Sequence, residues 1–146
     1  MQLPRYEMKA EDSLSVFEFV SEGPRGKIYK LIKFSQTNTD GIYNLAFGDR
    51  DPSSGEIDDF AVSDNGDSEV ILATVVAAVY SFTESRRNAW VYATGSTRAR
   101  TRLYRMGISK YLSQAVTDFN VYGLLNGEWE RFSVDVAYTA FLIQRR

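Results

Sequence analysis

The stretch FNVYGLLNGEWERFSV, residues 119–134, decides the fold of this 146-residue chain. Apolar and polar side chains alternate on both sides of Asn126-Gly127, as they do along half-buried strands. Asn-Gly is a strong signal for a two-residue hairpin turn, because both residues tolerate the positive φ angles that such a turn requires. The sequence therefore predicts an antiparallel hairpin between Phe119–Leu125 and Glu128–Val134.

Further strands are predicted on both sides of this hairpin. In the first half of the chain, short runs rich in β-branched and aromatic residues alternate with turns containing Gly, Pro or Asp, which is typical of an antiparallel meander. In the run Lys27–Ser35, lysines recur every three residues, which leaves a helix as the alternative there. The predicted strands are Leu14–Glu22, Lys27–Ser35, Ile42–Phe47, Glu56–Val62, Ala89–Thr94 and Ala137–Ile143.

Two helices are predicted. Glu69–Glu84 contains no Gly or Pro over sixteen residues, and its apolar residues nearly encircle it, so we expect a helix buried on most sides. Its valines leave a long strand as the alternative. Asp67 or Ser68 is expected to cap the start of this helix by accepting from free backbone N–H groups. A second helix is predicted over Thr97–Ala115.

The predicted fold class is α+β. The element order is ββββαβαβββ, with about seven strands in one mainly antiparallel sheet and two helices packed on it, most simply on one face. The length suits a single domain over residues 1–146, with residues 1–13 expected to be loosely held.

The composition excludes several kinds of chemistry. The chain has no Cys, which excludes disulfides and thiolate sites, and no His, which excludes imidazole bases and His-ligated metals. Catalysis would depend on carboxylates, Lys, Arg, Tyr, Ser or Thr, so an enzyme is less favoured than a binding domain. The apolar run Val70–Tyr80 is too short to cross a bilayer, and the N-terminus lacks a signal-peptide pattern. We therefore expect a cytoplasmic protein with no membrane partner and no cofactor.

Acidic and basic residues are unevenly distributed. Residues 1–73 contain fourteen acidic and seven basic side chains, whereas residues 74–146 contain five and ten. Such a division is typical either of a basic binding surface or of two halves that attract each other.

The segment Gly95–Arg105 is the most suggestive surface. At 3.6 residues per turn, Arg98, Arg102 and Arg105 fall within about 60° of one another and so share one outward stripe. Arg100 falls on the apolar side instead. Gly107 lies between two apolar clusters, where we expect the closest approach to the sheet. Arginines near a helix start oppose the helix dipole, and an anion would reverse that effect.

The leading hypothesis is a non-enzymatic domain that binds nucleic acid or another phosphate-bearing partner. Its predicted anion-binding residues are Ser96, Thr97, Arg98, Arg102 and Arg105, because hydroxyl, backbone N–H and guanidinium groups all donate to phosphate.

Several alternatives remain open for this surface. The stripe can be an ordinary solvated face whose arginines pair with acids from the N-terminal half, with Ser96 or Thr97 as a plain helix cap. It can also bind an acidic protein surface, or hold the phosphate of a small-molecule substrate in an enzyme. A homodimer module using Asn126–Val134 or the last strand as a sheet edge is a further alternative. Phosphate-loop and dinucleotide fingerprints are absent.

Two other groups of residues are weaker candidates. Acidic side chains gather around one turn, where they either offer oxygens to a hard cation or simply bond to the turn backbone, and their spacing does not match a calcium loop. We therefore predict no metal site. Aromatic residues on the strands near the second helix could stack bases if exposed, although strand aromatics are more often core. The acids are Asp49, Asp51, Glu56, Asp58 and Asp59, and the aromatics are Trp90, Tyr92, Phe119, Tyr122, Trp129 and Phe132.

Three segments carry a resemblance to a known family. Ser21–Gly26, Gly95–Tyr104 and Tyr138–Ile143 resemble the corresponding parts of small bacterial proteins that are classed together as a domain of unknown function. The resemblance extends over most of the chain and implies a stand-alone bacterial cytoplasmic protein. It implies no reaction, so no catalytic residue is transferred.

Overall fold

A computed structural model describes residues 5–58, 65–95 and 98–146, leaving aside the side chains of residues 112 and 113. This part of the chain forms an α+β fold with nine strands and three helices. The strands are β1 Lys9–Ala10, β2 Val16–Gly23, β3 Gly26–Gln36, β4 Ile42–Arg50, β5 Ile57–Asp58, β6 Trp90–Ala93, β7 Phe119–Leu125, β8 Glu128–Arg131 and β9 Ala140–Arg145. The helices are α1 Ser68–Glu84, α2 Arg98–Lys110 and α3 Leu112–Asp118.

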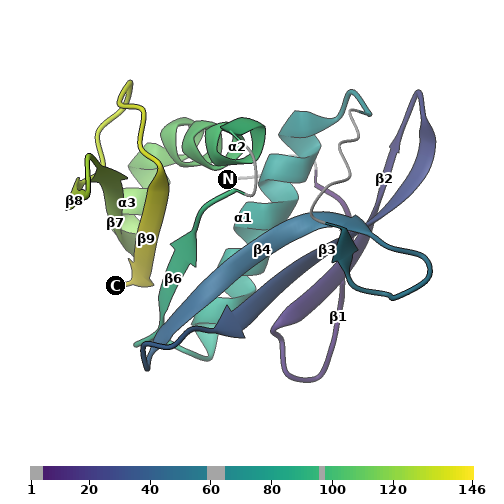
Figure 1. The fold of residues 1–146 in the computed structure, drawn as a ribbon, viewed down its shortest axis with the longest axis horizontal. Coiled ribbons are helices and arrows are strands. Elements are labelled where there is room, and N and C mark those ends of the chain that lie inside the picture. The colour runs from purple at the N-terminus through teal and green to yellow at the C-terminus, as the bar shows by residue number, and fades with distance from the viewer. Residues whose placement is uncertain (1–4, 59–64, 96–97) are drawn as a thin grey trace.

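The strands form one open sheet in the order β1-β2-β3-β4-β6-β9-β7-β8, with β5 paired to β4 outside this path. The pairing of β4 with β6 is parallel, and every other pairing among the described residues is antiparallel. A parallel pair requires a long crossover, and α1 supplies it between β4 and β6 (Figure 1). The predicted fold class is confirmed.

The helices cover one face of the sheet. Alternate residues along the central strands, including Leu45, Val91 and Phe141, are buried against α1 and α2. Figure 1 shows α1 crossing this side of the curved sheet, with α2 beside it. The opposite face carries no helix in the described part of the chain. This arrangement places the candidate site residues of α2 on the helical side.

The predicted hairpin, the first three strands and the long first helix are confirmed, although the second hairpin strand ends at Arg131. Of the predicted fourth strand, Glu56–Val62, β5 covers Ile57–Asp58, and positions 59–62 lie outside the described residues. The second predicted helix is wrong as one continuous element, because Tyr111 leaves helical geometry with φ −104° and ψ 17°, and the chain continues as α3. That break lets α3 lead directly into β7. The last strand begins later than predicted, at Ala140. Tyr138, just before it, packs its ring on Gly123 of β7, because a Cβ on Gly123 would lie only 2.4 Å from that ring.

Gly107 lies at a close approach, but not to the sheet. A Cβ added there would lie 3.0 Å from Leu72 Cδ2 of α1. The prediction of a contact with the sheet is therefore wrong, because α2 packs against α1 at this position.

Asp67 precedes α1 as predicted, yet its side chain makes no capping bond. Its carboxylate accepts hydrogen bonds from the Tyr6 hydroxyl and, at 2.5 Å, from the Ser21 hydroxyl. The backbone N–H of Tyr6 donates to Thr74 Oγ1 at 2.9 Å. These long-range bonds connect residues near the N-terminus to β2 and α1, which is a role that local sequence could not specify.

Candidate functional site

The start of α2 is positioned by a tight approach at Gly95. A Cβ at this residue would lie 2.4 Å from the backbone N of Thr101, so the first turn of α2 can pack here only against glycine. The Gly95 N–H donates to Thr101 Oγ1 at 3.0 Å, which fixes the chain between β6 and α2. Ser96 and Thr97, the two hydroxyl residues of the predicted anion site, lie outside the described residues.

The predicted arginine stripe lies on the outer side of α2. Arg98 and Arg102 are exposed and Arg105 is half-buried, and the first turn of α2 contains no acidic residue. Across residues 5–58, 65–95 and 98–146, no ion pair or hydrogen bond involves the side chain of any of the three. Ion pairs do form at other basic residues, namely Lys27, Lys30, Lys33, Arg50, Arg87, Lys110 and Arg145.

Arg100 points toward the packed side of α2, as its helical position predicts. It is half-buried, with its guanidinium carbon 5.8 Å from the centre of the Phe47 ring. Its terminal nitrogens also lie close to Gly48 of β4, because a Cβ added to Gly48 would be 2.9 Å from the nearer of them. Arg100 therefore connects α2 to the sheet and is not part of the exposed stripe.

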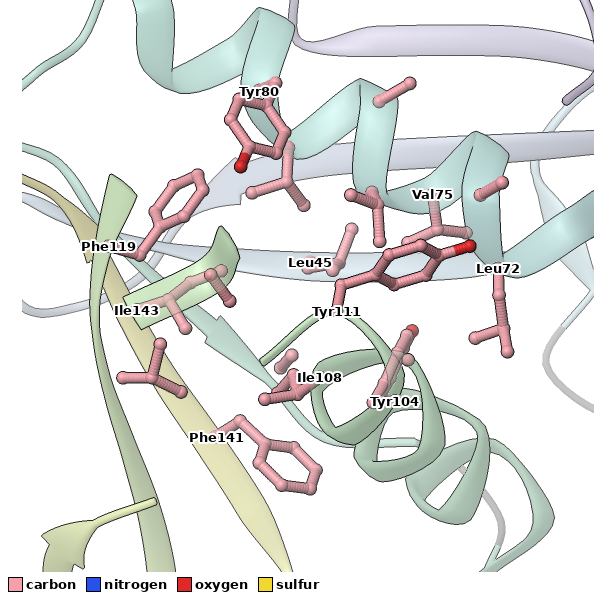
Figure 2. Close-up of a pocket in the computed structure, with 18 of the residues that line it drawn as sticks. Leu45, Leu72, Val75, Tyr80, Tyr104, Ile108, Tyr111, Phe119, Phe141 and Ile143 are labelled. Carbon is pink, nitrogen blue, oxygen red and sulfur yellow. The ribbon is translucent and has the colours of Figure 1, made fainter. Parts of the chain in front are cut away.

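A large cavity lies on the inner side of α2, between α1, α3 and the sheet (Figure 2). Its volume is about 520 Å³. Leu45, Ala93 and Phe141 contribute the floor from the sheet, and α1 and α2 supply opposite walls. Along one rim the lining side chains are only half-buried, so the cavity reaches the surface there; these are Val76, Ala77, Ser81 and Gln114.

Three tyrosines bring polar groups to this cavity. Tyr80 of α1 donates its hydroxyl to Asp118 at 2.5 Å; burial, and secondarily this bond, raises the pKa of Tyr80 to about 12. Tyr104 and Tyr111 are almost fully buried, yet within the described chain their hydroxyls make no hydrogen bond. Burial raises the pKa of Tyr104, so its hydroxyl stays protonated and able to donate. Figure 2 shows these two rings rising from the wall opposite α1.

The acidic side chains around residues 49–58 already interact with other groups of the same chain. Asp49 accepts from buried Lys30 at 2.5 Å, and Glu56 pairs with Lys33 at 3.5 Å. The Asp51 carboxylate accepts from the Ser53 hydroxyl and N–H, which lowers the pKa of Asp51. In the part of the chain that the structure covers, no three acids gather as a metal site. Asp58 is half-buried, and Asp59 lies outside the described residues.

The six candidate stacking aromatics divide between the two faces of the sheet. Phe119 is buried in the core and Phe132 packs on Tyr138 and Phe141, as the favoured interpretation of strand aromatics as core residues predicts. The other four pair up across the open face, where the ring centres of Trp90 and Tyr122 are 5.9 Å apart and those of Tyr92 and Trp129 are 6.2 Å apart. This face is on the opposite side of the sheet from α2, so these rings do not adjoin the arginine stripe.

The strand order also bears on the predicted homodimer edges. β9 pairs with both β6 and β7 and is therefore an interior strand, so the prediction that the last strand is an edge is wrong. β8 pairs only with β7 among the described strands and remains at the edge. Local sequence could not separate these cases, since interior and edge strands share the same alternation.

Sequence reasoning did not find the cavity. Its walls come from residues spread between positions 45 and 143, and no local pattern connects them. The available signal was the recurrence of tyrosine on the apolar sides of both predicted helices, at positions 80, 104 and 111. Such tyrosines indicate polar groups held within packed regions.

Comparison with known proteins assigns a family but no reaction. Residues 2–146 match the model of a family of unknown function (DUF6934), and the chain belongs to that family. No curated protein and no solved structure matches the chain. Among the described residues, no helix has both the length and the apolar character needed to cross a membrane.

Proposed function

We propose that this chain is a non-enzymatic interaction domain of the bacterial cytoplasm that binds a phosphate-bearing partner through the outer side of α2. The observation that supports this proposal is the stripe Arg98, Arg102 and Arg105, which has no carboxylate partner in the described chain although seven other basic residues have one. Nucleic acid is the partner class that best suits a row of exposed guanidinium groups.

The electrostatics of α2 favour an anion. Positive side chains near a helix start are destabilising by about 0.3–1 kcal/mol each where exposed, and no acid in the first turn compensates them. Phosphate oxygens accept from guanidinium groups in a bidentate geometry, which removes the repulsion between neighbouring arginines. A bound phosphate backbone would thus reverse the sign of an unfavourable local arrangement.

The alternative of an enzyme acting on a phosphorylated small molecule has less support. Arg98 and Arg102 are exposed, and neither lines the cavity beneath α2 or the second cavity, beside β1. Phosphate held by these groups would remain in solvent and away from Tyr80, Tyr104 and Tyr111. An exposed surface is sufficient to bind the backbone of a nucleic acid, whereas an enzyme for a small molecule needs an enclosing pocket.

A salt titration of oligonucleotide binding tests the proposal. Fluorescence anisotropy with labelled single-stranded and duplex DNA and RNA should show binding at low salt that weakens steeply as salt rises. Substituting Arg98, Arg102 and Arg105 together by Gln should lower the slope of log K against log salt by about 2–3, because each phosphate contact contributes about 0.7–0.9. A mononucleotide and inorganic phosphate serve as parallel arms that distinguish a polymer from a single phosphate.

The matched control removes the same charge elsewhere. Lys9, Arg25 and Lys27 are exposed and belong to β1, the turn between β2 and β3, and β3, not to α2. Their joint substitution by Gln changes net charge by the same amount. This control should retain most of the affinity. Absence of binding to every probe at low salt, or equal losses in the two triple variants, would overturn the proposal.

A further inference from the structure

We propose that the cavity between α1, α2, α3 and the sheet binds an apolar small molecule that carries a hydrogen-bond-accepting oxygen. This site uses the inner side of α2 and is independent of the phosphate-binding surface proposed for its outer side. The ligand's apolar body occupies the hollow, and its oxygen accepts from the hydroxyls of Tyr104 and Tyr111.

The size of the hollow is the first support. Protein interiors are close-packed and contain few voids larger than a water molecule. The cavity here measures about 520 Å³, within the range of about 300–1,000 Å³ that small-molecule sites occupy. Its lining is mainly aliphatic and aromatic, and apolar cavities hold water poorly. An apolar occupant fills this space more favourably than water does.

Small residues on several elements create the hollow. Leu72 and Val75 of α1 and Ile108 of α2 all line it, together with several residues of small side-chain volume (Figure 2). The space therefore does not result from one missing side chain on one element. The small lining residues are Ala73 and Ala77 on α1, Ala93 on β6, Gly107 on α2 and Ala115 on α3.

Two buried hydroxyl groups supply the polar contacts. Tyr104 is 6 % exposed and Tyr111 is 7 % exposed, and neither hydroxyl has a hydrogen-bond partner in the described chain. No side-chain oxygen or nitrogen there is both fully enclosed and unpartnered, so both hydroxyls retain some accessible surface, and both tyrosines line the cavity. Hydroxyls without a partner are unfavourable in an apolar site, and a ligand oxygen would satisfy them.

The charges around the cavity define the ligand class. Arg5, an exposed residue, is the one charged side chain among the described lining residues. A charge placed deep inside would be desolvated without a partner, which is strongly unfavourable. Tyr80 is already bonded to Asp118, so among the tyrosines of the described lining Tyr104 and Tyr111 are the donors without a partner. A neutral molecule with a carbonyl, ether or hydroxyl oxygen fits this arrangement.

A pair of probes that differ by one oxygen tests both parts of the proposal. Naphthalene and 1-naphthol would each be titrated into ¹⁵N-labelled protein while amide chemical shifts are followed. Both should give saturable shifts around Leu72, Ile108 and Ala115. We expect 1-naphthol to bind about fivefold more tightly, which is the scale of one net hydrogen bond. Joint substitution of Tyr104 and Tyr111 by Phe should reduce that preference to within about twofold.

Filling variants test the location. Ala115→Phe places a ring in the cavity and should weaken 1-naphthol binding at least about tenfold, as loss of the ligand's space requires. Val116→Phe adds the same ring at the neighbouring, 43 % exposed position and should bind as the wild type does. Circular dichroism checks that each variant folds. If Ala115→Phe does not fold, Ala77→Phe, which fills the cavity from α1, takes its place.

Definite results would overturn the proposal. Lack of saturable shifts with both probes, shifts confined to another region, or unchanged binding in the filling variant would each exclude the cavity as the site. A preference for 1-naphthol that survives loss of both hydroxyls would exclude the proposed ligand class. The triple arginine variant should bind 1-naphthol normally, so failure here and failure of phosphate binding are separable.

Discussion

Helix α1 separates two differently packed regions of the same sheet. On the side of β2, β3 and β4, Phe82 stacks on Phe34 with ring centres 4.2 Å apart, and Phe17 meets Phe34 edge-on at 6.1 Å. We call this region the aromatic half. On the side of β6, β9 and β7, the same helix borders the cavity of about 520 Å³. We call this region the hollow half.

The difference indicates separate roles for the two halves. Stacked aromatic rings bury large areas and leave little empty volume, so the aromatic half supplies stability. The hollow half is less closely packed than the aromatic half of the same chain. Sequences usually depart from good local packing where another requirement takes precedence, and ligand binding is such a requirement.

The largest expected effect comes from truncating equivalent core rings. Phe82 and Phe141 are both 0 % exposed, but Phe141 belongs to the lining of the cavity whereas Phe82 lies in the aromatic half. Phe82→Ala should lower the free energy of unfolding by about 3–5 kcal/mol. Phe141→Ala should cost at least about 1 kcal/mol less, since the space it leaves joins the existing cavity, whose lining side chains can move into it. Urea denaturation of both variants checks this, and equal losses would contradict the contrast between the halves.

An intermediate effect is expected from enlarging adjacent alanines. Ala78 is 0 % exposed in the shared core, whereas its neighbour Ala77 lines the cavity. Ala78→Leu should destabilise the fold by about 1–3 kcal/mol through overpacking. Ala77→Leu should change the free energy of unfolding by no more than about 0.5 kcal/mol, because the added methyl groups enter empty space. The same denaturation experiment measures both, and a comparable loss for Ala77→Leu would show that the hollow half has no room.

The smallest expected effect is a loss of stability at alkaline pH that originates in the hollow half. The pKa of Tyr80 is raised from 10.0 to about 12, so the folded state favours the neutral hydroxyl. Its contribution to stability is complete below pH 10 and disappears as the pH rises toward 12. Tyr80→Phe should therefore show a shallower fall in unfolding free energy between pH 9.5 and 11.5, measured by urea titration. Tyr29→Phe, at a 55 % exposed position, is the control, and identical slopes in the two variants would refute the assignment.

Most secondary structure could be predicted because its causes are local. The alternation around Asn126-Gly127 and the uninterrupted run Glu69–Glu84 each contain enough information for their own element. The helical spacing also predicts that Arg98 and Arg102 face outward and that Arg100 faces inward. The break at Tyr111 could not be predicted, because the residues around it are compatible with a helix and the direction of β7 determines where the helix ends.

The amino-acid sequence by itself determined the α+β class, the turns and the arginine stripe, because these depend on neighbours within a few residues. Only the tertiary structure decided that β9 is an interior strand, that Asp67 accepts from Tyr6 and Ser21, and that Gly107 contacts α1. The cavity belongs to the same group. An empty volume depends on how the walls of separate elements meet, and the distance between those walls is not encoded in any one segment.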